Sequence, residues 1–176
     1  MDKFQENLYS RQIGALGKDV VSKLANLTVK ILGVNTLGLE VAKCLTLMGV
    51  KRIYLCNGDS HKYYKNFALK LGDFDSKTKK NSMISLDNTI KYLKSLNQYV
   101  EITKPKLGVG LSESKVDILI QTDITSYNSK AISNLCRINK TKYILCVNVG
   151  LTGYIFNDFI KHIVIDPDGE KKLTCF

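Results

Sequence analysis

The chain has 176 residues, of which 44% are hydrophobic and 24% are charged. This length suits one domain with a single core, and the ordinary composition excludes disordered, collagen-like and coiled-coil proteins. The net charge of +10 suggests an acidic partner, but lysine supplies every basic residue except Arg11, Arg52 and Arg137. Because arginine is favoured for bidentate recognition of phosphates and bases, we do not expect a nucleic-acid partner.

No segment is apolar over the roughly 18 residues that a membrane-spanning helix requires, and residues 1–7 lack the apolar core of a secretory signal. We therefore expect no membrane partner. The five cysteines are scattered and form no Cys-x-x-Cys pair, so neither a metal site nor a disulfide framework is predicted. Reduced and mostly buried thiols are typical of a cytoplasmic or nuclear protein, which is the location we expect.

Hydrophobic periodicity predicts helices and strands in alternation along the chain. The expected elements are a helical segment over 5–26 with a break near Gly14 and Gly17, a strand over 28–34, a helix over 36–49, a strand over 52–56, a long loop over 57–77, a helix over 80–97, strands over 100–103 and 116–121, a helix over 126–139 and a strand over 143–149.

This alternation predicts a Rossmann-like α/β fold, with a doubly wound, mostly parallel sheet and helices on both faces. Two short segments, 154–156 and 162–165, are expected to form an antiparallel C-terminal hairpin ahead of a turn over 166–169. We expect a single domain with three parts: an N-terminal helical segment over 1–26, a Rossmann-like core over 27–150 and the hairpin over 151–176.

The turn after the first strand resembles a dinucleotide-binding motif but departs from it. A Gly-x-Gly-x-x-Gly pattern is expected there, and the chain has Gly33, Asn35 and Gly38 at the three glycine positions. Gly33 suits the tight turn, and Gly38 allows the helix to pack closely on the strand. Asn35 replaces the glycine that lets phosphate approach the backbone, and its side chain occupies the space that a pyrophosphate needs.

The second strand lacks the acidic residue that holds a ribose. Asn57 stands where a carboxylate is expected, and Asp59 comes two residues late. Two independent departures therefore predict that the fold is kept and that this chain holds no nucleotide or other cofactor.

The motifs in combination resemble the ubiquitin-activating enzyme family and its ThiF-type adenylating relatives. Residues 9–13 read Tyr-Ser-Arg-Gln-Ile, residues 33–43 read Gly-x-x-x-Leu-Gly-x-Glu-Val-Ala-Lys, and Cys44 follows where the family usually has asparagine. Residues 150–159 and 168–170 look more like the ubiquitin enzyme than like its SUMO counterpart. The resemblance runs from about Tyr9 to the end of the chain, with slippage around 75–90.

The family has two such repeats, which pair. One binds ATP and Mg²⁺ and adenylates the modifier's C-terminal carboxylate, and the other is inactive. This chain resembles the inactive, N-terminal repeat, because 66–70 lacks the family's Arg-Gln pair and Ile124-Thr125 stand where its catalytic Asp-Asn is expected, with Asp123 one position early. None of the cysteines matches the family's thioester nucleophile. The resemblance implies a fragment of a longer enzyme, whose partners are an active adenylation half and ubiquitin or a ubiquitin-like modifier.

One residue is expected to take part in the chemistry. In this family the arginine of the Tyr-x-Arg-Gln segment crosses to the partner half and contacts the ATP phosphates, and that role falls on Arg11. A fork of donors beside developing phosphate charge stabilises a transition state electrostatically. The alternative for Arg11 is an ordinary exposed charge on an amphipathic helix.

Three other functions remain open. The chain is similar enough to the family to be the small subunit of a SUMO-type activating enzyme. A stand-alone nucleotide- or NAD-binding domain is a second alternative, against which Asn35 and the missing strand-end acid argue. A lysine-rich module that binds nucleic acid is the third, since 61–106 carries a local excess of positive charge.

Overall fold

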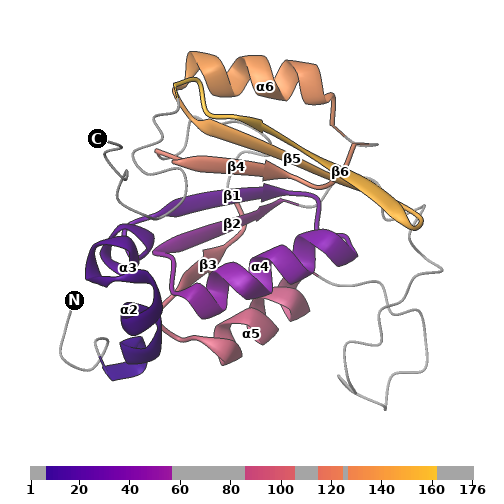
Figure 1. Cartoon of the computed structure of the whole chain (residues 1–176). Coiled ribbons are helices and arrows are strands. Elements are labelled where there is room, and N and C mark those ends of the chain that lie inside the picture. The colour runs from indigo at the N-terminus through magenta and orange to yellow at the C-terminus, as the bar shows by residue number, and fades with distance from the viewer. Residues whose placement is uncertain (1–6, 57–85, 106–114, 125–126, 162–176) are drawn as a thin grey trace, which may run out of the picture.

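A computed structural model describes residues 7–56, 86–105, 115–124 and 127–161 of the chain (Figure 1). Its elements are α2 (Ser10–Leu16), α3 (Lys18–Leu24), β1 (Thr28–Leu32), α4 (Thr36–Met48), β2 (Arg52–Cys56), α5 (Leu86–Leu96), β3 (Glu101–Thr103), β4 (Ile118–Gln121), α6 (Ser129–Ile138), β5 (Lys142–Val149) and β6 (Thr152–Asp158). The strands form one sheet in the order β3-β2-β1-β4-β5-β6, and every pair is parallel except β5 with β6. The predicted α/β class and mostly parallel sheet are confirmed.

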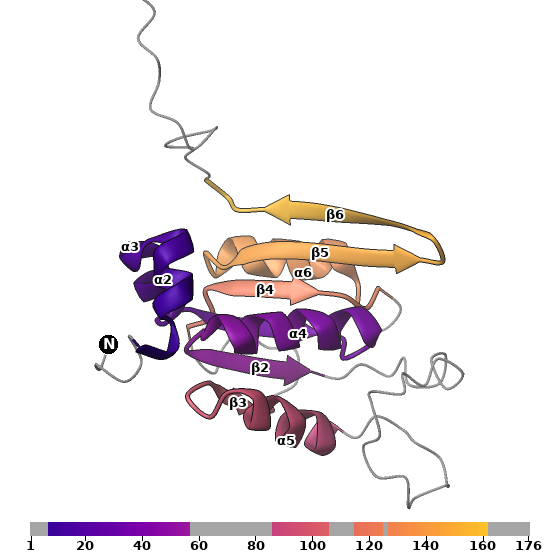
Figure 2. The same ribbon diagram turned by 60° about the horizontal axis from the view of Figure 1, so that its bottom comes forward.

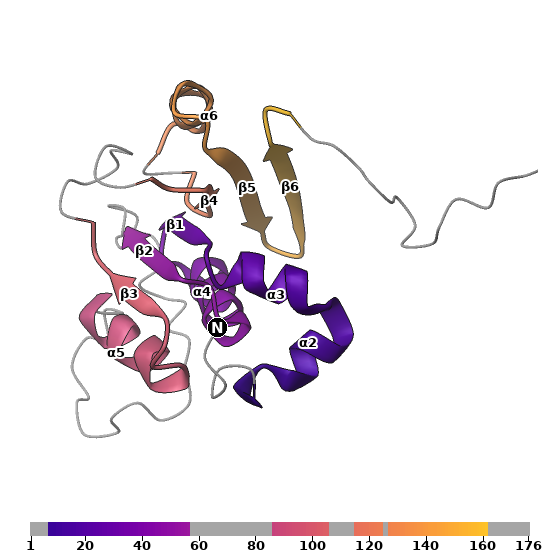
Figure 3. The ribbon, with the colours of Figure 1, turned by 90° about the vertical axis from the view of Figure 1, so that its left-hand side faces the viewer.

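Side chains that alternate along the strands separate two apolar clusters, one on each face of the sheet. The first cluster packs on α4 and α5 and comes mainly from β1, β2 and β3, with Ile120 of β4. The second packs on α6 and comes mainly from β4 and β5, with Leu32 of β1 and Cys56 of β2. Figure 3 views the strands nearly end-on, with α4 and α5 on one side of the sheet and α6 on the other. Burial on both faces explains why β1 is buried at every position.

The ends of α4 follow from its sequence. Asn35 precedes the helix in an extended conformation, and Gly49 ends it in the left-handed conformation at φ 75°. A left-handed residue after the last turn is favourable for glycine because it lacks a Cβ. The end of the helix predicted over 36–49 is thereby confirmed.

The N-terminal helical segment is two short helices separated by Gly17, while Gly14 lies inside α2. Both helices lie beside the tails of the strand arrows, at the amino ends of the parallel strands (Figure 2). The carboxyl ends of these strands, where the glycine-containing turn lies, form the opposite edge of the sheet.

The antiparallel C-terminal hairpin is formed by β5 and β6. The strand expected over 154–156 extends over β6, and it pairs with β5 from Tyr143 opposite Asp158 to Val149 opposite Thr152. The pairing with β5 is favoured because only two residues, Gly150 and Leu151, separate the strands, and Gly150 adopts the positive φ of 60° that a tight hairpin turn requires. The expected partner segment over 162–165 lies outside the described residues.

Candidate functional site

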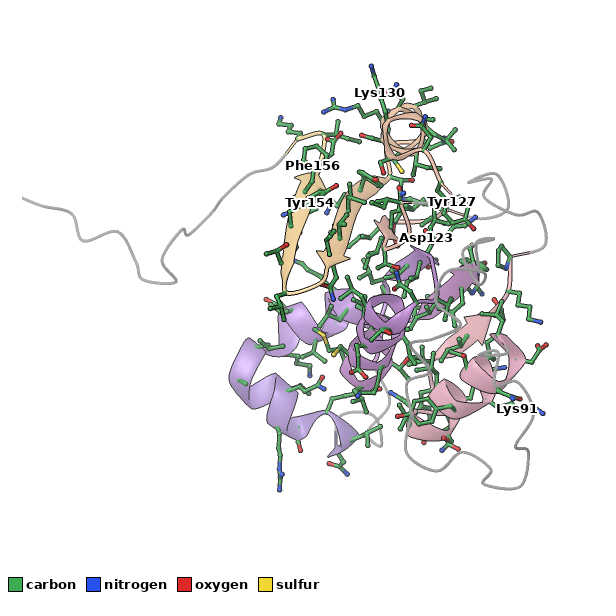
Figure 4. The ribbon with its side chains drawn as sticks, turned by 90° about the vertical axis from the view of Figure 1, so that its right-hand side faces the viewer. Lys91, Asp123, Tyr127, Lys130, Tyr154 and Phe156 are labelled. Carbon is green, nitrogen blue, oxygen red and sulfur yellow. The ribbon has the colours of Figure 1, made fainter. Side chains whose placement is uncertain are left out.

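The candidate site lies where β1 and β4 end side by side. The strand order runs in one direction from β1 to β3 and in the other from β4 onwards, so this is the point where an open α/β sheet binds ligands. Figure 4 looks onto this edge and shows Asp123 in the middle of the sheet, with Tyr127 between it and α6. The turn after β1 and the residues after β4 therefore decide what the site can hold.

Gly33 and Gly38 bring the backbone of α4 close to both strands. Gly33 has a φ of 102°, and a Cβ there would lie 2.5 Å from the Cβ of Asp123. A Cβ on Gly38 would lie 2.0 Å from the carbonyl oxygen of Gly33 and 2.8 Å from Oγ1 of Thr122. All three distances are too short for a real Cβ, so any larger residue at either position would push α4 away from the sheet.

Asn35 caps α4 with its own side chain. Its Oδ1 accepts a hydrogen bond of 2.8 Å from the backbone N–H of Gly38, and its Nδ2 donates one of 2.8 Å to the carbonyl oxygen of Thr122. A nucleotide phosphate in a Rossmann site uses the N–H groups of this same helix end. The carboxamide therefore stands where the phosphate would have to bind, and the turn does not fit a nucleotide without displacement of Asn35.

Thr122 connects the two sides of the turn, a contact that the sequence analysis did not anticipate. Its hydroxyl donates a hydrogen bond of 2.6 Å to the carbonyl oxygen of Gly33. With the Asn35 bond, Thr122 holds the turn after β1 against the end of β4. A buried threonine after a buried strand is common, and only the pairing of β1 with β4 shows that it faces the glycine turn.

A buried polar network supports the segment that follows β4. Gln121 is fully buried, and its Nε2 donates to the carbonyl oxygens of Asp123 and Tyr127, at 2.8 and 3.1 Å, and to Oγ of Ser129 at 3.1 Å. The hydroxyl of Tyr143 donates to Oε1 of Gln121 at 2.7 Å. Burial raises the pKa of Tyr143 to about 12, so it stays a neutral donor.

The predicted site residues occupy different parts of the chain. Asp123, which the sequence places one position early for the family's catalytic acid, is 1% exposed and packs against Gly33, whereas Ile124 is 45% exposed. Asn57, Asp59, Thr125 and the segment 66–70 lie outside the described residues. Gly33, Asn35 and Gly38 are thus the members of the expected nucleotide site that the structure brings together.

Arg11 lies far from this turn. It is exposed on α2, and α2 contacts the C-terminal end of α4: the Tyr9 ring lies against Gly49, and Nε2 of Gln12 donates 3.1 Å to the carbonyl oxygen of Leu47. Asn35 caps the opposite end of α4, which has 13 residues and is therefore about 20 Å long. Arg11 cannot reach the glycine turn of its own chain.

Among the residues that the structure describes, no group of three or more His, Cys, Asp or Glu side chains could hold a metal ion. In the same part of the chain, none of the helices has the length and apolar character needed to cross a bilayer.

The chain resembles known proteins in sequence and in fold, although no family model matches it. Over 173 residues, which are 98% of the chain, it is 34% identical to ubiquitin-activating enzyme E1 1 of Candida albicans, and it covers 17% of that enzyme. It is 27% identical to SUMO-activating enzyme subunit aos-1 of Caenorhabditis elegans, over 92% of the chain and 49% of that subunit.

Among solved structures, Escherichia coli MccB has a similar fold. The TM-score is 0.65 at 20% sequence identity, over 96% of this chain and 52% of MccB. The chain thus spans about a sixth of the ubiquitin-activating enzyme and about half of the other two proteins.

Proposed function

We propose, on the premise that this chain is homologous to the adenylation region of ubiquitin-activating enzymes, that it is the non-catalytic adenylation half of such an enzyme. In this role it pairs with an ATP-binding half, which adenylates ubiquitin and passes it on as a thioester. The proposal assigns ATP and Mg²⁺ to that other half and no cofactor to this chain. The cytoplasm and the nucleus are the proposed locations.

The observation that carries the proposal is the occupied end of α4. The Asn35 carboxamide accepts the Gly38 N–H and donates to the Thr122 carbonyl, so this N–H of the helix end that would bind phosphate already has an acceptor. A phosphate would have to displace two hydrogen bonds within the protein before it gained any of its own. This arrangement supports an inactive half and argues against the alternative of a stand-alone nucleotide or NAD domain.

The position of α2 supports a role for Arg11 in the other half. The helix is held at the C-terminal end of α4, about 20 Å from Asn35, so Arg11 projects away from the chain's own glycine turn. If Arg11 contacts ATP phosphates, those phosphates belong to the partner half. A guanidinium there supplies a planar fork of donors to the charge that develops on the phosphates.

Substitution of Arg11 in the assembled enzyme tests this proposal. We expect Arg11→Ala to slow adenylation of the modifier by about 10- to 150-fold, because losing a hydrogen bond to a charged group costs about 1.5–3 kcal/mol. The affinity for the modifier should be nearly unchanged. Arg11→Lys should recover only part of the rate, since a point charge replaces the fork. ATP–pyrophosphate exchange at saturating modifier measures the effect directly.

Lys23→Ala is the matched control, because it removes one exposed positive charge from the neighbouring helix α3 and leaves the sequence of α2 unchanged. It should exchange at the wild-type rate. Wild-type exchange by Arg11→Ala would mean that Arg11 is an ordinary surface charge, and equal losses in both variants would point to net charge instead of a phosphate contact.

A second candidate is the small subunit of a SUMO-type activating enzyme, which the similarity to aos-1 favours. The two candidates share the pairing and the Arg11 role and differ in the modifier. Pyrophosphate exchange stimulated by ubiquitin but not by SUMO would support the first, and the reverse would support the second.

A further inference from the structure

A small buried cluster attaches α2 to the rest of the fold. We call it the Tyr9 anchor, and it consists of Tyr9, Gly49, Asn97 and the backbone carbonyl of Thr46. Nδ2 of Asn97 donates to the Tyr9 hydroxyl oxygen at 2.7 Å and to the Thr46 carbonyl at 2.9 Å. Tyr9 is 6% exposed and Asn97 is 8% exposed, so these bonds form away from water.

The anchor joins three segments that are distant in the sequence. Tyr9 immediately precedes α2, Gly49 ends α4, and Asn97 follows α5. Oδ1 of Asn97 also accepts the backbone N–H of Tyr99 at 3.1 Å, so the carboxamide is fixed through both its oxygen and its nitrogen. A Cβ on Gly49 would lie 2.4 Å from the Tyr9 ring, so glycine is the residue that lets the ring pack against the end of α4.

The anchor determines where Arg11 points. Tyr9 and Gln12 are three residues apart and therefore lie on one side of the helix, and both bond to the α4–α5 region. Successive residues of a helix are rotated by about 100°, so Arg11 projects from a different side of the helix than Tyr9 and Gln12. Arg11 is accordingly exposed. Directional hydrogen bonds fix the rotation of α2 about its axis more tightly than apolar contacts would.

We propose that Tyr9 and Asn97 are positioning residues for Arg11: they hold α2 in the rotation that presents the guanidinium to the partner half. This inference rests on the proposed function, because it requires Arg11 to act on phosphates in the other half. It adds that Tyr9 affects the reaction only through Arg11 and contacts neither ATP nor the modifier.

Tyr9→Phe is the test variant, because it removes the hydroxyl and keeps the ring against Gly49. Loss of one buried hydrogen bond should raise hydrogen–deuterium exchange of the α2 amides by about two- to tenfold. Pyrophosphate exchange in the assembled enzyme should also fall, but by less than the loss of about 10- to 150-fold expected for Arg11→Ala, because the guanidinium is still present and only less firmly oriented. Tyr9→Ala, which also removes the ring, should cause a larger loss in both measurements.

A double-mutant cycle separates positioning from a general structural role. If Tyr9 acts through Arg11, then Tyr9→Phe in an Arg11→Ala background should cause no further loss of pyrophosphate exchange. The α2 amides should still exchange faster in that background. Gly14→Ala is the matched control on the same helix, since a Cβ there meets no atom within 4 Å, and it should leave the pyrophosphate exchange rate unchanged.

The outcomes that would overturn the inference differ from those that would overturn the proposed function. Wild-type pyrophosphate exchange by both Tyr9 variants, or equal losses with and without Arg11, would refute the positioning role and leave the Arg11 contact standing. Wild-type exchange by Arg11→Ala would refute the Arg11 contact, and the positioning role with it.

Discussion

At the scale of single residues, Asn35 shows how one side chain can take the place of a ligand. Its oxygen accepts the Gly38 N–H, as a phosphate oxygen would, and its nitrogen donates to the Thr122 carbonyl, which a phosphate could not do. The same carboxamide therefore caps α4 and joins the turn after β1 to the end of β4. Substitutions at this position should affect stability as well as the shape of the site.

Asn35→Ala should lower the free energy of unfolding by about 1–2 kcal/mol, because it removes a helix cap and a second, part-buried hydrogen bond. Urea unfolding measures the loss. Asn128→Ala is the matched control: Asn128 caps α6 through the Ala131 N–H, and within the described part of the chain its side chain makes this bond alone. Its loss should be smaller. Equal losses in the two variants would show that the Thr122 bond adds nothing to stability.

At the scale of elements, α6 and the edge strand β6 are joined by an ion pair. Arg137, in the last turn of α6, donates to both carboxylate oxygens of Asp158 at 2.6 and 3.0 Å. Ser133 Oγ and the Ile160 N–H also donate to Asp158, whose side chain is 6% exposed. Burial raises the pKa of this carboxyl, but the Ile160 N–H and Arg137 outweigh it, so its pKa lies below the ordinary 3.8.

A lowered carboxyl pKa makes stability depend on acidity in a defined direction. The ionised Asp158 stabilises the fold above its ordinary pKa, and this contribution is lost as the pH falls through the lowered value. We expect wild-type stability to decline below about pH 4. Arg137→Ala should be less stable near pH 6 and should decline less on acidification, as measured by urea midpoints at several pH values.

Lys104→Ala serves as the control for this prediction, because it breaks the exposed ion pair between Lys104 and Asp87, at 2.6 Å. Exposed pairs contribute about 0–1 kcal/mol, so the stability of this variant should stay near that of the wild type. An acid decline in Arg137→Ala as steep as in the wild type would contradict the assignment to Asp158.

At the scale of the whole molecule, the glycine turn and α2 lie at opposite ends of the parallel strands. The carboxyl edge contains the glycine turn closed by Asn35, and α2 with Arg11 lies at the amino ends of the strands. A fold that binds a nucleotide on its own would use the first edge. The proposed half-enzyme uses the second, because Arg11 is exposed on α2 at that end.

The chain by itself should therefore not bind ATP appreciably. Titration calorimetry with ATP and Mg²⁺ is the measurement, and NAD in a parallel titration covers the oxidoreductase alternative. No heat beyond dilution is expected for either, because the Asn35 carboxamide already accepts the Gly38 N–H, one of the donors that a phosphate would use. A micromolar dissociation constant would contradict the proposal that this half holds no cofactor.

Local patterns in the sequence were enough to predict most elements and their ends. The helix over 36–49 and the strand over 52–56 are close to α4 and β2, because periodicity, a polar cap and a terminal glycine are local signals. The roles of Gly33 and Gly38 in the turn could also be predicted, since backbone geometry restricts those positions to glycine. The departure at Asn35 was visible for the same reason.

Only the tertiary structure decided which distant groups meet. Asn35 bonds Thr122 across 87 positions, and Tyr9 bonds Asn97 across 88. No periodicity encodes such partners, because a hydrogen bond depends on where folding brings two groups and not on their spacing in the chain. The departure at Asn35 could therefore be read from the sequence, whereas its bond to Thr122 and the attachment of α2 through Tyr9 became visible only in the folded chain.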